Sequence, residues 1–386
     1  MKIAIVTGDD VFTDDPDQLC AALAARGHEA LTYVRQPADA STDGEGRIRS
    51  ISVGPQVATS AADVLPHVGD WAATLERLWS SDPPDVVHAY GWLGGLAAQL
   101  AARRQRIPIV QTFQGLAATS GGGPRQESER ERIEPLLARG AAWATGECTG
   151  DVDVLARLRR GRARLSILGS GIDVERYSPV GPAVARNGLH RVLGMAPTLS
   201  ADNGFDFTIR ALPRVLGAEL IIAETAPADR GHDEDRAELE RLAAELGVSD
   251  RVHFAGPVGA DELPTLLRSA DVVACTPRRP PRATTVLRAM ASGVAVVALP
   301  VGVLNDVVVD AVTGLVLAQH SPAALAAGLR SLLAQSFQCD SMGAAGRSRA
   351  VSRFSWDRIA LDAVSIYRRL GSQHPVPSDL QAAGPR

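Results

Sequence analysis

A chain of 386 residues, 45% of them hydrophobic, can bury a sizeable core, and its length favours two domains over one. Its formal net charge of −4 and its pI of about 6.1 exclude a global attraction to nucleic acid or to an anionic membrane surface. The four cysteines show no CxxC spacing, so we expect reduced structural thiols and no metal site.

The first half of the chain alternates short β-branched strands with helices. Strands are expected at residues 3–6, 31–34, 83–90, 107–112, 143–145 and 165–168, and helices at 16–26, 71–78 and 96–103. Asp15 is expected to cap the first helix, because it directly precedes Pro16 at the first helical position. Residues 41–49 and 117–132 lack an apolar period and are interpreted as loops, the second leading into a charged helix. This alternation predicts a parallel sheet with right-handed crossovers.

The pattern restarts after residues 179–188, whose Pro, Gly and Ala content is typical of a linker. Strands are expected at 191–194, 220–223, 252–254, 272–275 and 294–299, and helices at 207–216, 234–246, 263–268 and 325–333. An amphipathic helix over 356–370 is followed by a tail that we expect to be disordered. The chain enters its first strand without a signal peptide, and no apolar run reaches membrane-spanning length. We therefore expect a cytoplasmic protein without a transmembrane segment.

Residues 270–299 hold a strand, a loop, a helix and a second strand. Ligands of doubly wound sheets bind beyond the carboxyl ends of the strands, so the loop 276–285 is expected to face a ligand crevice. Four arginines crowd this loop and the helix that follows it: Arg278, Arg279, Arg282 and Arg288.

The helix and strand after that loop, LRAMASGVAVVA (287–298), resemble the donor-site helix of glycosyltransferase family 4, which comprises retaining, nucleotide-sugar-dependent enzymes of GT-B fold. Five other segments resemble family segments in the expected order: DVVHA (85–89), PIVQTF (108–113), GID (171–173), SADVV (269–273) and FSW (354–356). The resemblance implies an α/β protein of GT-B architecture, with two Rossmann-like doubly wound domains facing a cleft. The implied parts are an acceptor-side domain at 1–180, a donor-side domain at 181–355, a helix at 356–372 that crosses back to the first domain, and a disordered tail at 373–386.

The polar half of the family motif is replaced in this chain. The two family glutamates fall on Pro280 and Arg288, and the histidine near the reacting sugar falls on Gln114. The arginine and lysine that bind the donor diphosphate fall on Thr198 and Asn203, and a glycine pair after the second strand of the donor domain falls on Glu224 and its neighbour. Because the departing diphosphate must be met by cations and backbone donors, these changes predict a large loss of donor affinity.

The resemblance gives two sets of candidate site residues and no identified catalytic residue, metal or cofactor other than a nucleotide sugar as co-substrate. The donor-side candidates are Thr198, Asn203, Glu224, Arg278, Arg279, Arg282 and Arg288; the acceptor-side candidates are Asp9, Asp10, His88, Tyr90, Trp92 and Gln114. The arginines either bind a phosphate from the other side of the cleft or are solvated replacements. His88, at the end of a strand, is either a cleft residue or a packed structural one.

Two functions remain open from the sequence. One is a hexosyltransferase that acts with retention on a nucleotide sugar and a small-molecule acceptor. The other is a catalytically silent paralogue that serves as binding or scaffold partner of an active glycosyltransferase. A dinucleotide-dependent enzyme is disfavoured, because no GxGxxG follows any expected strand.

Overall fold

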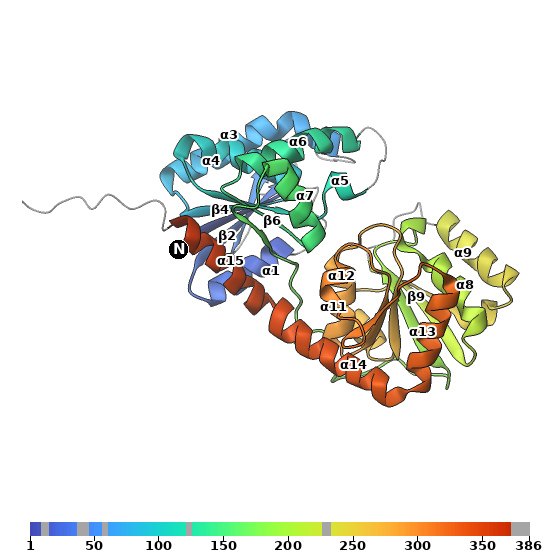
Figure 1. Ribbon diagram of the computed structural model, residues 1–386. Helices are drawn as coiled ribbons and strands as arrows, with labels where there is room; N and C mark the ends of the chain where they lie inside the picture. The colour runs from blue at the N-terminus through green and yellow to red at the C-terminus, as the bar shows by residue number, and fades with distance from the viewer. Residues whose placement is uncertain (9–14, 37–45, 56–60, 121–125, 226–232, 372–386) are drawn as a thin grey trace, which may run out of the picture.

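The computed structural model describes residues 1–8, 15–36, 46–55, 61–120, 126–225 and 233–371. It contains two α/β lobes, each built on one parallel sheet, and a C-terminal helix that runs from the second lobe to the first (Figure 1). The expectation of two Rossmann-like domains is confirmed. Asp9 and Asp10, together with the tail from residue 372, lie outside the described residues.

The first domain has a seven-stranded sheet of order β3-β2-β1-β4-β5-β6-β7. Its strands are β1 (Lys2–Thr7), β2 (Glu29–Gln36), β3 (Ile48–Ser52), β4 (Val86–Tyr90), β5 (Ile109–Phe113), β6 (Trp143–Gly146) and β7 (Leu165–Ile167). Its helices are α1 (Asp15–Ala25), α2 (Ala61–Val64), α3 (Val68–Ser81), α4 (Trp92–Gln105), α5 (Ala117–Ser120), α6 (Gln126–Gly140) and α7 (Thr149–Arg159).

Alternate side chains of β1 enter two different cores. Ala4 and Val6 pack with the helices α3 and α4, whereas Ile3 and Ile5 pack with α1 and with the C-terminal helix. Because both faces of the sheet are covered, its central strands β4 and β5 are buried at every position.

The second domain has a six-stranded sheet of order β10-β9-β8-β11-β12-β13. Its strands are β8 (His190–Ala196), β9 (Ala218–Glu224), β10 (Val252–Pro257), β11 (Val272–Cys275), β12 (Ala295–Ala298) and β13 (Gly314–Val316). Its helices are α8 (Phe205–Ala211), α9 (Asp233–Glu245), α10 (Leu263–Leu267), α11 (Ala283–Ala291), α12 (Leu304–Val307), α13 (Pro322–Ala334) and α14 (Ser336–Arg349). The strand order reverses between β8 and β11, and at such a switch point the loops of neighbouring strands diverge and leave room for a ligand.

Two chain segments connect the domains side by side. A π-helical turn, η5 (Ala350–Phe354), joins α14 to α15 (Trp356–Gly371), and Ile172 forms a bridge with Ser355 of the returning chain. Residues of α15 are buried against β1, β4 and α1, so this helix completes the core of the first domain (Figure 1).

The structure corrects some sequence-based expectations. Ile48 and Arg49, placed in a loop, belong to the edge strand β3, and residues 117–132 contain α5 and the start of α6. Helices α7, α12 and α14 and the strand β13 were not expected. Asp15 is the first residue of α1, and its buried carboxylate contacts other segments of the chain instead of serving only as a cap.

Candidate functional site

The loop after β11 carries most of the charged candidates. Pro277, Pro280 and Pro281 prevent regular hydrogen bonding until α11 begins at Ala283, with Arg282 as its extended N-cap residue. Gly204, in the loop after β8, lies so close that a Cβ there would be 1.8 Å from the carbonyl oxygen of Thr276. The two loops at the switch point are therefore packed directly on each other.

Two arginines of this loop are paired with carboxylates of the segment after β8, one in its loop and one at the start of α8. Arg278 Nη2 lies 2.5 Å from Asp206 Oδ2, and Arg279 Nε lies 3.3 Å from Asp202 Oδ1. Both arginine side chains are about half exposed, at 56% and 48%. Ion pairs with this exposure stabilise a protein by about 0–1 kcal/mol, so they can exchange partners at little cost.

Arg282 points in a different direction, into the first domain. Its Nη2 lies 3.0 Å from Asp15 Oδ2, and its Nε lies 3.5 Å from Glu147 Oε1. Ser170 Oγ lies 2.6 Å from Asp15 Oδ2 and 2.7 Å from Glu147 Oε1, and Gln114 donates to the same Asp15 oxygen over 3.0 Å. We call these five residues the Arg282 cluster. The side chains of Asp15 and Glu147 are 3% and 5% exposed, so the cluster is a nearly dry ionic contact between the domains.

Arg288 has a different partner from Arg278, Arg279 and Arg282. Its guanidinium carbon lies 5.7 Å from the centre of the ring of Tyr177, which is buried beside the linker. This geometry is that of a cation–π contact. The side chains of the four arginines thus reach three separate parts of the chain.

The remaining donor-side candidates are neutral or acidic. Asn203 Nδ2 donates to the backbone oxygen of Thr198 over 2.9 Å, which closes the loop after β8 on itself. Glu224 is the half-buried last residue of β9. Neither place supplies a cation for a phosphate.

On the first domain, His88 is the centre of a neutral, fully buried network. Its Nδ1 lies 2.6 Å from Tyr367 Oη of α15, and its Nε2 lies 2.7 Å from Thr112 Oγ1, which in turn contacts Thr145 Oγ1 at 2.7 Å. The ring stacks on Tyr90 with centroids 4.7 Å apart. Burial lowers the pKa of His88 from 6.5 to about 3, so the imidazole is neutral and structural. We call His88, Tyr90, Thr112, Thr145 and Tyr367 the His88 network.

Trp92 and Gln114 border a small cavity of about 30 Å³ at the carboxyl edge of this sheet. Glu134 lies at its wall, and burial raises the pKa of that carboxyl despite the nearby Arg130. The cavity has room for a water molecule but not for a sugar ring. Tyr90 is buried, so the acceptor-side candidates offer little open surface in this arrangement.

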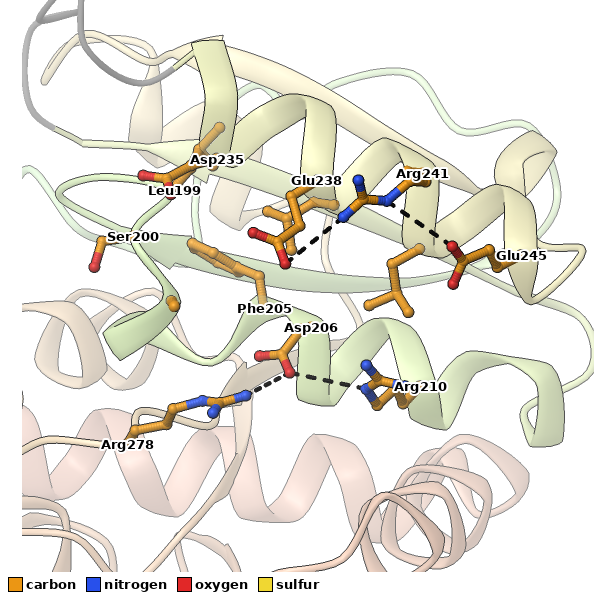
Figure 2. Close-up of a pocket in the computed structure, with 13 residues that line it drawn as sticks. Leu199, Ser200, Phe205, Asp206, Arg210, Asp235, Glu238, Arg241, Glu245 and Arg278 are labelled. Atoms are coloured by element: carbon orange, nitrogen blue, oxygen red, sulfur yellow. Dashed lines mark hydrogen bonds and ion pairs between the residues drawn. The ribbon is translucent and has the colours of Figure 1, made fainter.

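A larger pocket of about 340 Å³ opens beside the switch point, between α8 and α9 (Figure 2). Its floor is apolar, with Leu199 and Phe205, and its two rims are charged. One rim is the chain Arg278–Asp206–Arg210 and the other is Glu238–Arg241–Glu245, as Figure 2 shows. The sequence-based candidates included only Arg278 of these residues.

The members of the Arg282 cluster that the sequence-based candidates did not include are Asp15, Glu147 and Ser170. Glu147 directly follows β6, and Ser170 follows β7. Ligands of doubly wound sheets bind beyond the carboxyl ends of the strands, so the rule that indicated the loop after β11 also covers these two residues. Among the described residues no group of three or more His, Cys, Asp or Glu side chains is arranged to hold a metal ion. None of the described helices is long and apolar enough to cross a membrane.

Two Rossmann-like domains joined by two chain segments define the GT-B class of glycosyltransferase folds. Solved structures of glycosyltransferases superpose on nearly the whole chain. A sucrose-phosphate synthase from Thermosynechococcus elongatus superposes with a TM-score of 0.81 over 97% of this chain and 100% of that chain, at 20% identity. The Anabaena protein HepE, solved in complex with UDP-glucose, gives 0.71 over 96% and 99%, at 18% identity.

Sequence comparisons identify the family. The profile of the glycosyl transferases group 1 matches residues 183–349, and that of the glycosyl transferase 4-like domain matches residues 16–171. D-inositol 3-phosphate glycosyltransferases of Salinispora tropica and Salinispora arenicola are 30% identical over 75% and 73% of this chain, and these alignments span 65% and 68% of those proteins. The enzyme of the same name from Xylanimonas cellulosilytica is 29% identical over 93% of this chain and 91% of its own length. The chain belongs to the group 1 glycosyltransferases.

Proposed function

We propose that this chain is a catalytically silent member of its family, which keeps the two-domain fold but does not turn over a nucleotide sugar. The observation that carries the proposal is the set of contacts that the four arginines in and after the candidate donor loop make within the chain. Each of them contacts a side chain of the same chain, so a diphosphate must displace an existing partner of every guanidinium that it binds.

A comparison of magnitudes bears on Arg282, whose side chain is 26% exposed. Breaking its ion pair costs about 2–3 kcal/mol, and a hydrogen bond to a charged group returns about 1.5–3 kcal/mol. Moving Arg282 from Asp15 and Glu147 to a phosphate therefore brings about no net gain in free energy. The positions of Thr198 and Asn203 offer no compensating positive charge.

The role proposed for such a protein is that of a binding or scaffold partner for an active glycosyltransferase. The parts of the chain that the family motif shares, such as Met290 and Val296, are buried packing residues. They preserve a shape on which a partner can dock, whereas the replaced positions carried the donor contacts.

A second candidate function is retaining transfer of a hexose from a nucleotide sugar that is bound by Arg278 and Arg279. Their exposure favours this alternative, because weak surface pairs with Asp206 and Asp202 can be exchanged for phosphate contacts. Both side chains lie at the switch point of the second sheet, where this fold class binds ligands.

The two candidates are separated by an activity assay. The purified chain is incubated with UDP-, GDP- and ADP-sugars, with and without D-inositol 3-phosphate, and released nucleotide is measured. The Xylanimonas relative serves as positive control. We expect no release above the rate without protein; turnover that is lost in Arg278→Ala and Arg279→Ala would overturn the silent assignment and establish the second candidate.

A further inference from the structure

We propose that the Arg282 cluster is an interdomain latch, in which the chain's own guanidinium holds the two domains together. The inference rests on the proposed function, because it describes how the candidate donor loop of that protein is occupied. It makes the joined arrangement the resting state of the free protein, without any ligand.

The first domain contributes two carboxylates, one hydroxyl and one amide to the cluster, and these groups suit the binding of one cation. Asp15, Glu147, Ser170 and Gln114 all come from the first domain, and each lies at or beyond the carboxyl end of a strand of the same sheet or at the start of α1. The single hydroxyl hydrogen of Ser170 can serve only one of the two carboxylates at a time. Arg282 of the second domain supplies a positive charge to both carboxylates.

Burial makes this contact stronger than the other arginine pairs of the loop. The carboxylates of Asp15 and Glu147 are almost completely removed from water, so their attraction to a cation is screened far less than that of a surface pair. Separation of the domains would break the ion pair of Arg282 with Asp15 and Glu147 and return all three charged groups to water. Arg279, by contrast, pairs with Asp202 of its own domain, so this pair does not hold the two domains together.

A second contact closes the same side of the interface. Thr149, the first residue of α7, donates its backbone N–H to Asp306 Oδ2 over 2.6 Å, and its hydroxyl lies 2.9 Å from both carboxylate oxygens. Asp306 belongs to α12 of the second domain, so this helix N-terminus is capped from across the interface. Arg349 donates to the backbone oxygens of Asp306 and Val307 and fixes α12 to the crossover segment.

The crossover lies next to the cluster, because Ser170 directly precedes Gly171 and Ile172 in the chain. The backbone N–H of Ile172 donates to Phe354 over 2.7 Å, and a Cβ on Gly171 would lie 2.4 Å from the ring of Trp356. This tight pairing confines relative motion of the domains to rotation about the crossover. The Arg282 cluster lies beside this pairing through Ser170, and it adds an ionic contact that must break when the domains rotate.

The test measures the distance between domains in the complete chain without nucleotide. The four native cysteines are buried, so spin labels can be confined to two introduced cysteines at the exposed positions Ala73 in α3 and Ala244 in α9. Distance distributions are recorded by double electron–electron resonance for the parent and for three variants. Arg282→Ala removes the latch, Arg282→Gln keeps a hydrogen-bond donor toward Asp15 as a safeguard for folding, and Arg279→Ala is the matched control.

We expect the ratio of long to short distances to rise at least tenfold in Arg282→Ala and in Arg282→Gln, which corresponds to about 1.4 kcal/mol. Arg279→Ala should reproduce the parent distribution. Parent-like distances in both Arg282 variants, or the same opening in Arg279→Ala, would overturn the latch. Since no nucleotide is present, that failure would leave the silent assignment untouched; conversely, turnover by the parent enzyme would overturn the silent assignment without bearing on these distances.

Discussion

The His88 network and the Arg282 cluster are both buried polar contacts at the sheet of the first domain, and each is completed by a residue from far along the chain. Tyr367 completes the first from α15, and Arg282 completes the second from the start of α11. The first network is uncharged and fully buried, and its donors and acceptors match without any ion. The second depends on opposite charges that belong to two domains.

This difference separates a structural contact from an adjustable one. A neutral network inside one core is lost only when that core unfolds, because every member is desolvated within a single packing unit. An ionic contact across an interface can be lost while both domains remain folded, because water can enter between them. Of the two, only the Arg282 cluster can open while both domains stay folded.

The largest expected effect comes from truncating the centre of the neutral network. His88→Ala leaves a cavity and removes the partners of Tyr367 and Thr112, so we expect a loss of about 3–5 kcal/mol in the free energy of unfolding. Urea denaturation measures it. His88→Gln, which can still hydrogen-bond, should lose less; equal losses in the two variants would contradict the network.

A smaller loss is expected from Arg282→Ala. Breaking the contact with Asp15 and Glu147 should cost about 2–3 kcal/mol, below the value for a fully buried pair because the Arg282 side chain is 26% exposed. Thermal unfolding is expected to show domains that melt separately, since the interface and not either core is weakened. A single cooperative transition identical to that of the parent would contradict this prediction.

The pH dependence of stability sharpens the comparison further. The pKa of His88 falls to about 3 in the folded chain from 6.5, so between these values the unfolded chain binds the extra proton. Stability from this group is complete above pH 6.5 and is lost as the pH falls, by up to about 1.4 kcal/mol per pH unit. Denaturant midpoints at pH 4, 5 and 6 should therefore fall more steeply in the parent than in His88→Gln, and equal slopes would show that His88 takes up no proton on unfolding.

The smallest effect is expected for Arg279→Ala. Its pair with Asp202 is about half exposed, so we expect a change in unfolding free energy within about 0.5 kcal/mol. The same urea titration measures it. A loss as large as that of Arg282→Ala would remove the distinction between surface and interface arginines.

The sequence predicted the fold well where its signals are local. Apolar β-branched runs and Gly or Pro stops indicated β1, β4, β5 and β11, because each is buried on both faces. It missed the three-residue strand β13 and placed the start of β3 in a loop, since short edge strands have little apolar pattern. The scaffold residues of α11, such as Leu287 and Met290, are buried as the family resemblance implied.

The candidate site was less predictable, because its contacts join distant segments. Arg282 and Asp15 are separated by 267 positions, and His88 and Tyr367 by 279, so no local pattern pairs them. The sequence could place Arg278, Arg279 and Arg282 on one loop, but it could not show that the third points into the other domain. It left His88 open between a cleft and a structural role, and its partners decide for the structural one.

The most direct test of the central claim is a calorimetric titration of the parent protein with UDP, GDP and ADP and then with their sugar conjugates. We expect no binding heat at millimolar ligand, because a nucleotide would have to displace the partners that the guanidinium groups of the loop already have in the chain. Binding at micromolar concentration that is abolished by Arg278→Ala or Arg282→Ala would contradict it, since those arginines would then serve the nucleotide.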